Sequence, residues 1–280
     1  FRRVLFRSPC IIVPAEGEEN FLFMVLPVRL KAWKEASYQE PKAESFQVTP
    51  GSNATTVKVT YRFPQTEARW NITYKIYASG VIKVDNRFMA EGDQAPMIPR
   101  VGLRMQLPES FTDLTYYGRG PKENYRDRRT SQFIGEYAIP VKDMYEPYVR
   151  PQENNHRTDI YWCALTDKTQ RGLLLIADRT FELNASNYPL ESMDSGDTID
   201  NGAPRTEKTH HRHLTDPLPE KMVDLFIDYR MMGVGGDDSW GATAHEPYLI
   251  RPGKENAIEY GFSLVPFDKK EDYKYLIRQY

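Results

Sequence analysis

The chain has 280 residues, of which 40% are hydrophobic and 12% aromatic, and its formal net charge at pH 7 is −2. This composition excludes a disordered protein, and the near-zero charge offers no basic surface for nucleic acid or for a membrane. No apolar run approaches the roughly 20 residues of a membrane-spanning helix. We therefore expect an ordered protein with neither nucleic acid nor a membrane among its partners.

The first eight residues, F-R-R-V-L-F-R-S, are basic, but prolines at positions 9 and 14 follow in place of the sustained apolar stretch of a signal peptide. The string R-V-L-F-R-S is similar to the in-frame translation of a short-read sequencing adapter. We expect residues 1–8 to be such a translation and residues 1–25 to be non-native or fragmentary. Residues 26–280 are then expected to form one domain, since no linker or internal repeat interrupts them.

Strand signals fill the rest of the chain. From Ser45 onward, short stretches alternate polar and apolar residues, which is the period of a β-strand, and turn signals separate them. The expected strands cover residues 57–63, 72–77, 81–84, 101–107, 159–165, 172–177, 223–229 and 258–265. A turn at Ser79-Gly80 joins two of them as a hairpin. Helical periodicity is confined to short candidates near residues 31–37 and 218–222, so we predict an all-β antiparallel sandwich.

Residues 117–128 read Y-G-R-G-P-K-E-N-Y-R-D-R, a spacing that fits neither a phosphate-binding loop nor a dinucleotide-binding turn. We interpret this string as a loop that its own side chains hold in place. Asn124 and Asp127 are expected to stabilise turns, and Arg119 or Arg128 to pair bidentately with a carboxylate.

A second string, G-V-G-G-D-D-S-W, ends at Trp240. Gly235 and Gly236 permit positive φ, and Asp237 and Asp238 can accept hydrogen bonds from the turn, so the loop would project Trp240 rigidly. A projected indole suits stacking on the C–H face of a sugar ring, whereas a tryptophan that caps the core is the alternative.

The adjacent carboxylates Asp237 and Asp238 do not suit glycoside hydrolysis by themselves. Retaining glycosidases need two carboxyl groups about 5–5.5 Å apart across the scissile bond, whereas adjacent residues of an extended segment point to opposite sides. Turn bonding or orientation of the neighbouring tryptophan is the expected role. Binding of Ca²⁺ or Mg²⁺ by their oxygens stays open.

Six strings carry a resemblance to a known family. They are L-P-V-R-L-K-A-W-K at 26–34, P-R-V-G-L-R-M at 99–105, the string at 117–128, D-M-Y-E-P-Y-V-R-P-Q-E-N at 143–154, H-R-H-L at 211–214 and the string that ends at Trp240. In this order they resemble the C-terminal domain, the fifth and small-chain-like domain, of lacZ-type β-galactosidases in glycoside hydrolase family 2. The resemblance implies an antiparallel β-supersandwich similar to the galactose mutarotase-like fold.

The resemblance also implies that the chemistry lies outside this chain. In that family two glutamates of a separate (β/α)8 barrel, one acid/base and one nucleophile, carry out retaining hydrolysis of terminal β-D-galactosides such as lactose. It assigns no catalytic residue, metal or cofactor to this domain, and it places Mg and Na in the missing catalytic domain. Trp240 would pack on the substrate at the active-site mouth, supported by Gly235, Gly236, Asp237 and Asp238, and the chain alone should be inactive.

The implied partners are the galactoside substrate, the remaining domains of the same chain and further copies in a homo-oligomer. A contact of residues 117–128 and 143–154 with a neighbouring domain or subunit is an alternative to a purely structural role. The resemblance implies a cytoplasmic enzyme, with the periplasm as the alternative.

Two other classes of function stay open. A stand-alone carbohydrate-binding or mutarotase-like sugar epimerase domain would share the architecture, and His211 or His213 could then act as acid/base. Zinc is disfavoured, because a strand would place His210 on the opposite face. A purely structural domain would show an exposed apolar patch. Cys163 is expected to be a small buried residue.

Overall fold

The computed structural model describes residues 33, 42–91, 97–149, 151–193, 214–237, 242–251, 253, 255–268 and 271–279. The strands are β1 (Lys42–Thr49), β2 (Ala54–Phe63), β3 (Ala68–Tyr77), β4 (Ile82–Ala90), β5 (Arg100–Pro108), β6 (Asp113–Gly120), β7 (Phe133–Pro140), β8 (Arg157–Thr166), β9 (Gly172–Ser186), β10 (Met222–Met231) and β11 (Ile258–Phe267). The helical segments are η2 (Pro64–Thr66), η3 (Val141–Asp143), η4 (Leu190–Met193), η6 (Glu246–Tyr248) and α2 (Tyr273–Ile277). The named strands pair antiparallel throughout, which confirms the predicted all-β class.

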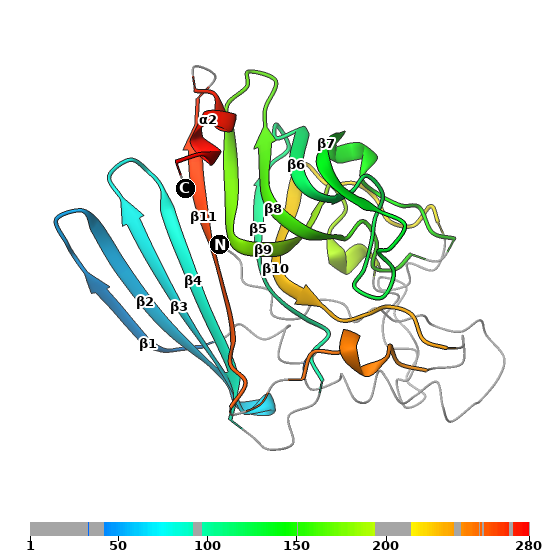
Figure 1. Cartoon of the computed structure of the whole chain (residues 1–280), viewed down its shortest axis with the longest axis horizontal. Helices are drawn as coiled ribbons and strands as arrows, with labels where there is room; N and C mark the ends of the chain where they lie inside the picture. The colour runs from blue at the N-terminus through cyan, green and yellow to red at the C-terminus, as the bar shows by residue number, and fades with distance from the viewer. Residues whose placement is uncertain are drawn as a thin grey trace.

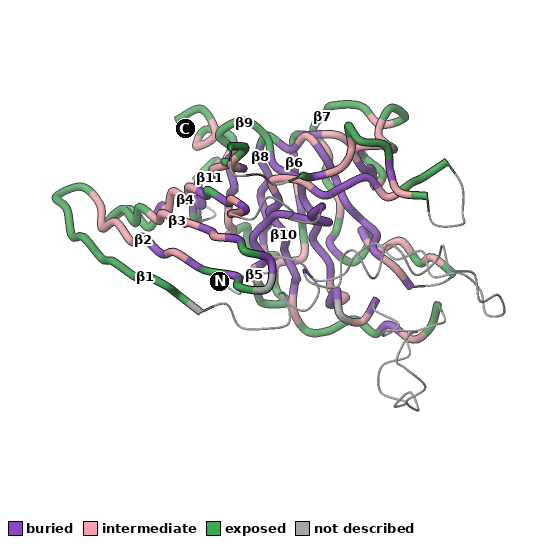
Figure 2. Tube along the Cα trace, turned by 90° about the horizontal axis from the view of Figure 1, so that it is seen from below, coloured by how far each residue is buried: buried purple, intermediate pink, exposed green. Residues whose placement is uncertain are grey.

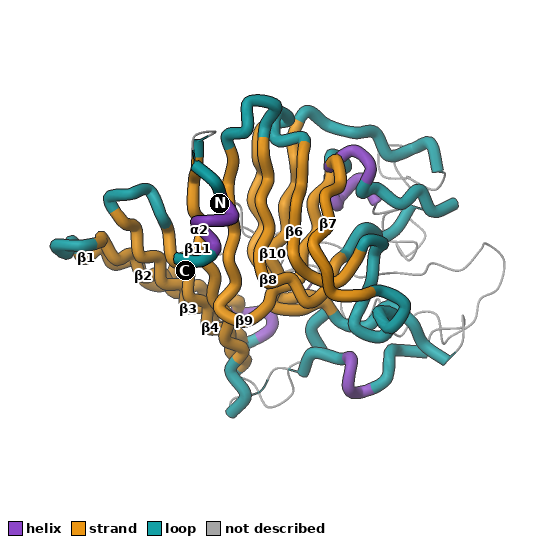
Figure 3. Tube along the Cα trace, turned by 45° about the horizontal axis from the view of Figure 1, so that its top comes forward, coloured by secondary structure: helices purple, strands orange, loops and turns teal. Residues whose placement is uncertain are grey.

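One row of strands runs in the order β1-β2-β3-β4-β11-β9-β8-β6-β7, and β5 and β10 join it through β9 (Figure 1). β9 belongs both to the row and to the β5–β10 pair, because its residues 172–177 pair with β11 and its residues 182–186 pair with β10. Figure 3 shows the strands side by side. Side chains of β2, β3 and β4 share one hydrophobic core with those of β5 and β10. The strands therefore form two packed layers, as in a β-sandwich.

Alternation of residue type explains the strands. In β2, Val59, Tyr61 and Phe63 are buried, whereas Lys58 and Arg62, on the opposite face, are exposed. The other predicted strands, at 72–77, 81–84, 101–107, 159–165, 172–177, 223–229 and 258–265, fall on β3, β4, β5, β8, β9, β10 and β11, except that residue 81 precedes β4. The expected β3–β4 hairpin is confirmed, with its turn at Gly80, where φ is 87° and a side chain would cause strain.

Three expectations differ from the structure. Residues 218–222 are not helical, since Met222 already pairs with Pro108 as the first residue of β10. The candidate helix at 31–37 lies outside the described residues apart from Trp33. The string at 117–128 begins inside β6, not in a loop. Gly118 is needed there for close packing, because a Cβ at this position would lie 2.5 Å from the Ile160 side chain.

The first four strands extend away from the rest of the molecule, and we call β1–β4 the wing (Figure 1). Burial decreases along it, from purple near β5 and β10 to green at the tip and along β1 (Figure 2). Trp33 is fully buried and packs on Phe88 of β4, with ring centroids 6.1 Å apart. The wing is thus anchored to the core at one end and projects at the other.

The C-terminal helix α2 covers a second, smaller apolar cluster. Tyr273, Leu276 and Ile277 pack on a group of buried side chains that includes Trp162 and Phe267. Within the part of the chain that the structure describes, no helix is long and apolar enough to cross a membrane.

Candidate functional site

The two glycine-containing strings of the sequence meet in the structure. Loop 121–132 follows β6 and residues 232–237 follow β10. The backbone N–H of Gly235 donates to Asp127 Oδ2 at 2.7 Å, across 108 positions of sequence. A Cβ on Gly233 would lie 2.7 Å from the same carboxylate. Asp127 therefore ties the loops together, and only glycine leaves room for the contact.

The reason predicted for the glycines of the second string is wrong. Among the described residues the glycine with a positive φ is Gly80, so neither Gly235 nor Gly236 serves a left-handed turn. Gly236 is required for space instead, because a Cβ there would lie 2.3 Å from the carbonyl oxygen of Ala242. Residues 236 and 242 thus approach each other closely at the base of the segment that joins them.

Asp237 lies on the surface, with its side chain 80% exposed and its Oδ1 2.8 Å from Nε2 of His245. Such an exposed pair adds little stability. Asp238 and Trp240 lie outside the described residues, as do the histidines at 210, 211 and 213, so their predicted roles stay predictions. Among the residues described, no group of three or more His, Cys, Asp or Glu side chains could hold a metal ion.

Buried hydrogen bonds hold the first loop. Asn124 is completely buried, and its Nδ2 donates to the carbonyl oxygens of Arg119 at 3.1 Å and Lys122 at 3.0 Å. Its Oδ1 accepts from the backbone N–H of Thr158 at 3.0 Å and from the hydroxyl at 2.6 Å. All these bonds are made in the interior, where an unmade bond would be expensive, so the turn-stabilising role of Asn124 is confirmed.

Ion pairs fix the same loop from the outside. Arg119 Nε lies 2.7 Å from Asp159 Oδ2, and Arg128 Nη2 lies 2.5 Å from Glu123 Oε1, so both arginines pair with a carboxylate, but each through one oxygen and not bidentately as expected. Arg129 contacts both carboxylate oxygens of Asp159, because its Nη1 donates to each of them at 2.8 Å. Asp159 sits at an irregularity of β8 with φ of 57°, a strained angle for a residue other than glycine.

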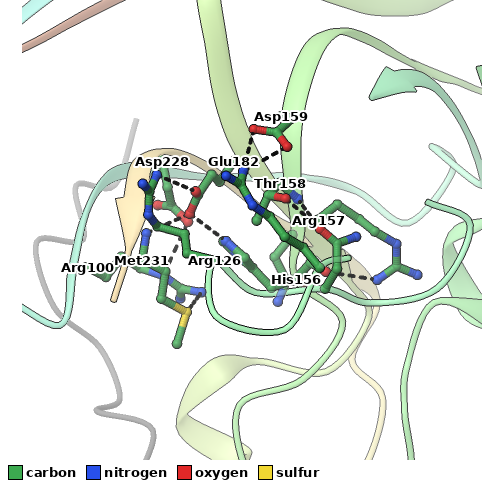
Figure 4. A network of polar contacts seen from close by, with 12 residues as sticks. Arg100, Arg126, His156, Arg157, Thr158, Asp159, Glu182, Asp228 and Met231 are labelled. Carbon is green, nitrogen blue, oxygen red and sulfur yellow. Dashed lines mark hydrogen bonds and ion pairs between the residues drawn. The ribbon is translucent and has the colours of Figure 1, made fainter. Parts of the chain in front are cut away.

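A network of buried charges lies beside these loops (Figure 4). Arg100 of β5 donates from Nη2 to Glu153 Oε1 at 2.8 Å, and its Nε lies 3.2 Å from Asp228 Oδ2 of β10 as an ion pair without aligned hydrogen bonding. The three side chains are at most 2% exposed. Charges buried to this degree persist only when they are paired.

A histidine and a glutamate extend the network. His156 Nε2 and Glu182 Oε2 are 2.8 Å apart, and the same oxygen accepts from the backbone N–H of Met231 at 2.7 Å. Arg126 of the first loop reaches Glu182 Oε1 at 3.8 Å, which brings the loop into the network (Figure 4).

Burial raises the pKa of the Asp228 carboxyl to about 7, although the positive charge of Arg100 opposes the rise. Burial also works against the charged form of Arg100, but the negative charges of Glu153 and Asp228 outweigh it and raise the pKa of the guanidinium. His156 and Glu182 have the residue types of an acid/base pair. They are 0% and 4% exposed, however, so a sugar cannot reach them in this conformation.

The sequence interpretation did not find this network. Arg100 and Asp228, together with a second buried ion pair of Arg104 and Asp224, occupy strands β5 and β10. Charged residues on one face of a strand are the usual mark of a solvent-facing side. The signal that was present is the polar run at 153–158, which directly precedes and enters β8.

The geometry defines an antiparallel β domain with a sealed charged interior and with two loops joined at its surface. A family model described as "Beta galactosidase small chain" matches residues 24–264, and the chain belongs to that family. The resemblance expected from the six strings is thereby confirmed at the level of the β-galactosidase small chain.

Curated relatives support the same family. The β-galactosidase of Priestia megaterium is 31% identical over 232 residues, which are 83% of this chain and 21% of the relative. That of Lactobacillus delbrueckii subsp. bulgaricus is 32% identical over 179 residues, which are 64% of this chain and 16% of the relative. The chain thus spans only a minor part of the relatives it matches.

Among solved structures, the galactosidase domain of an alpha-galactosidase-sucrose kinase is 10% identical, with 81% of this chain and 27% of that chain covered and a TM-score of 0.44. A putative aldose 1-epimerase from Escherichia coli K12 is 11% identical, with 80% of this chain and 69% of that chain covered and a TM-score of 0.41. Both likenesses are remote, and the fold follows from the strand pairing of this chain itself.

Proposed function

We propose that this chain is part of a longer, retaining β-galactosidase of glycoside hydrolase family 2, in which it completes the mouth of the active site and packs against the catalytic barrel. The observation that carries the proposal is the match of the small-chain family to residues 24–264. The relatives named β-galactosidase support the proposal that the chain is part of a longer protein, since the match covers 83% of this chain but only 21% of the Priestia megaterium enzyme.

In this proposal Trp240 is the residue that touches substrate. The described residues on either side of it, Gly236 and Ala242, are in close contact. The preceding segment is attached through Gly235 to Asp127, which belongs to the first loop. A loop with a fixed base positions an indole at low entropic cost, and the indole would stack on the apolar face of the sugar or of the aglycone.

Catalysis itself belongs to the part of the enzyme outside this chain. A retaining mechanism needs one carboxylate to attack the anomeric carbon and one carboxylic acid to protonate the leaving oxygen, both in contact with substrate. The neighbouring carboxylates Glu182 and Asp228 are 4% and 1% exposed, so neither suits that role. Mg and Na, if the enzyme uses them, would bind in the catalytic domain.

The decisive experiment joins residues 26–280 to the upstream coding sequence of the same gene and assays a chromogenic β-galactoside. The intact protein should hydrolyse it, and the chain alone should not. Trp240→Ala should weaken turnover in the steps that depend on the aglycone, whereas Trp162→Phe, a change beneath α2, serves as the matched control. Turnover by the chain alone would overturn the proposal.

A sugar epimerase or a stand-alone carbohydrate-binding domain is the second candidate, and the His156–Glu182 pair is the observation in its favour. Both side chains would have to become accessible first. Polarimetry of α-D-galactose with the isolated chain tests this candidate, because an epimerase would accelerate mutarotation and His156→Gln would remove the acceleration.

A further inference from the structure

The wing of strands β1–β4 has two faces of opposite character. Directly paired residues lie on one face of a sheet, so the register places a set of apolar side chains together. We call this set the wing patch, and it consists of Phe46, Val48, Val57, Tyr74, Ile76 and Ile82. The same face continues into the core, where Val59, Ile72 and Val84 are buried.

The second layer covers only part of this face. Val57, Tyr74 and Ile82 are partly buried against the core, but Phe46 is 66% exposed, Val48 49% and Ile76 40%. Figure 2 shows the change from buried to exposed along the wing. A sheet with one apolar face is stable when another layer covers that face, and here the covering layer ends before the apolar face does.

The opposite face of the wing carries charged side chains that face solvent. Arg69 pairs with Glu44 at 3.1 Å and with Glu91 at 2.7 Å. Farther along, Arg87 Nε lies 3.0 Å from Glu259 Oε1. Partly exposed ion pairs on one face and exposed phenylalanine and valine on the other show that only one face is suited to solvent.

The outer strand adds a second feature. β1 is the end of the strand row, so one of its edges has no neighbour among the strands that the structure describes. Proteins usually protect such an edge with charges, prolines or a covering element. The charged residues of β1, Lys42 and Glu44, lie at its start, whereas the stretch from Ser45 to Thr49 has no charge or proline and carries Phe46 and Val48. This is the composition of a strand that a partner covers.

We infer that the wing patch is the surface on which this domain docks against another domain of the longer β-galactosidase. The inference rests on the proposed function, because it takes the partner from the part of the relatives that this chain does not span. The wing patch is apolar, so its partner must offer an apolar surface. Another domain of the same polypeptide can do so permanently, because the two are covalently joined. A second copy of this chain is the competing occupant, and the experiment separates the two.

The test measures hydrogen–deuterium exchange in β1 and β2 for the isolated chain and for the intact protein that carries its own upstream sequence. The amides of β1 should exchange at least about tenfold more slowly in the intact protein, an effect equivalent to about 1.4 kcal/mol. Equal exchange in both proteins would overturn the inference. So would protection that appears in the isolated chain as its concentration rises, because that result indicates self-association.

Two variants sharpen the result. Phe46→Glu should lower the melting temperature of the intact protein and remove the protection of β1, but should leave the isolated chain unchanged because Phe46 is already largely exposed there. Gln47→Glu is the matched control, since it adds the same charge to the adjacent, exposed position on the other face. Equal effects of the two substitutions on the intact protein would refute docking through the patch.

The activity assay keeps the two proposals apart. An intact protein that protects β1 but does not hydrolyse β-galactosides would refute the proposed function and support the docking surface. An active intact protein with unprotected β1 would support the proposed function and refute the docking surface.

Discussion

Substitution of Arg100 by methionine should be among the most damaging single changes in this domain. The guanidinium contacts Glu153 at 2.8 Å and Asp228 at 3.2 Å, and it lies 4.8 Å from the ring centroid of Phe226. Methionine keeps much of the apolar volume but leaves two carboxylates buried without their cation. Breaking a buried ion pair from one side costs about 3–5 kcal/mol.

This magnitude is large beside the whole stability of a protein, which is about 5–15 kcal/mol. For a domain of this size it corresponds to a fall in melting temperature of roughly 6–20 °C. The loss should be smaller at pH 5 than at pH 8, because the orphaned carboxylates then take up protons. Burial already raises the pKa of Asp228 to about 7, so removal of the opposing positive charge favours the protonated form further.

The assay is urea unfolding of the chain followed by tryptophan fluorescence, with the free energy of unfolding obtained by linear extrapolation at both pH values. Arg69→Met is the matched control, because Arg69 makes comparable ion pairs at 36% exposure on the wing and should lose no more than about 1 kcal/mol. A loss below about 1 kcal/mol for Arg100→Met at pH 8, or an equal loss at pH 5, would refute the reasoning.

Three further predictions concern other parts of the fold. Asp127→Ala removes the acceptor for the Gly235 amide, so stability should fall by about 0.5–1.5 kcal/mol and this amide should exchange faster, whereas Asp127→Asn should retain most of the protection. The pKa of Asp228 in the folded chain lies above its ordinary value, so its ionisation destabilises the native state as pH rises from about 4 to 7. The free energy of unfolding of Asp228→Asn, measured by urea titration relative to the wild type, should therefore rise by about 2–4 kcal/mol across that interval. A difference that does not change with pH would contradict this. Cys163 is buried, and burial raises its thiol pKa, so in a Cys10→Ser background a thiol reagent should react only after unfolding; rapid labelling of the native chain would show that the site opens.

Local sequence determined most of the strands. In β2 and in the β3–β4 hairpin, alternation places apolar side chains on one face, and this pattern depends only on the geometry of an extended backbone. The prediction failed where glycines occupy the buried positions of an alternating strand. In β6 the glycines of Y-G-R-G suggested a loop, whereas Gly118 is in fact a packing position against Ile160.

The candidate site shows the same division. Strings along the sequence indicated which loops matter, and the structure joined them through a bond between Gly235 and Asp127 that 108 positions separate. The buried charges at Arg100 and Asp228 could not be recognised beforehand, because charged residues on one face of a strand normally face water.

The sequence by itself therefore determined the residue types, the strand period and the family strings, all of which are local properties of the chain. Tertiary structure alone decided which side of each strand would be covered. That outcome depends on how distant segments pack: strands β5 and β10 are sealed on their charged side, whereas the wing keeps exposed apolar residues at its tip. Burial is a property of the whole packed chain, so no single stretch of sequence contains it.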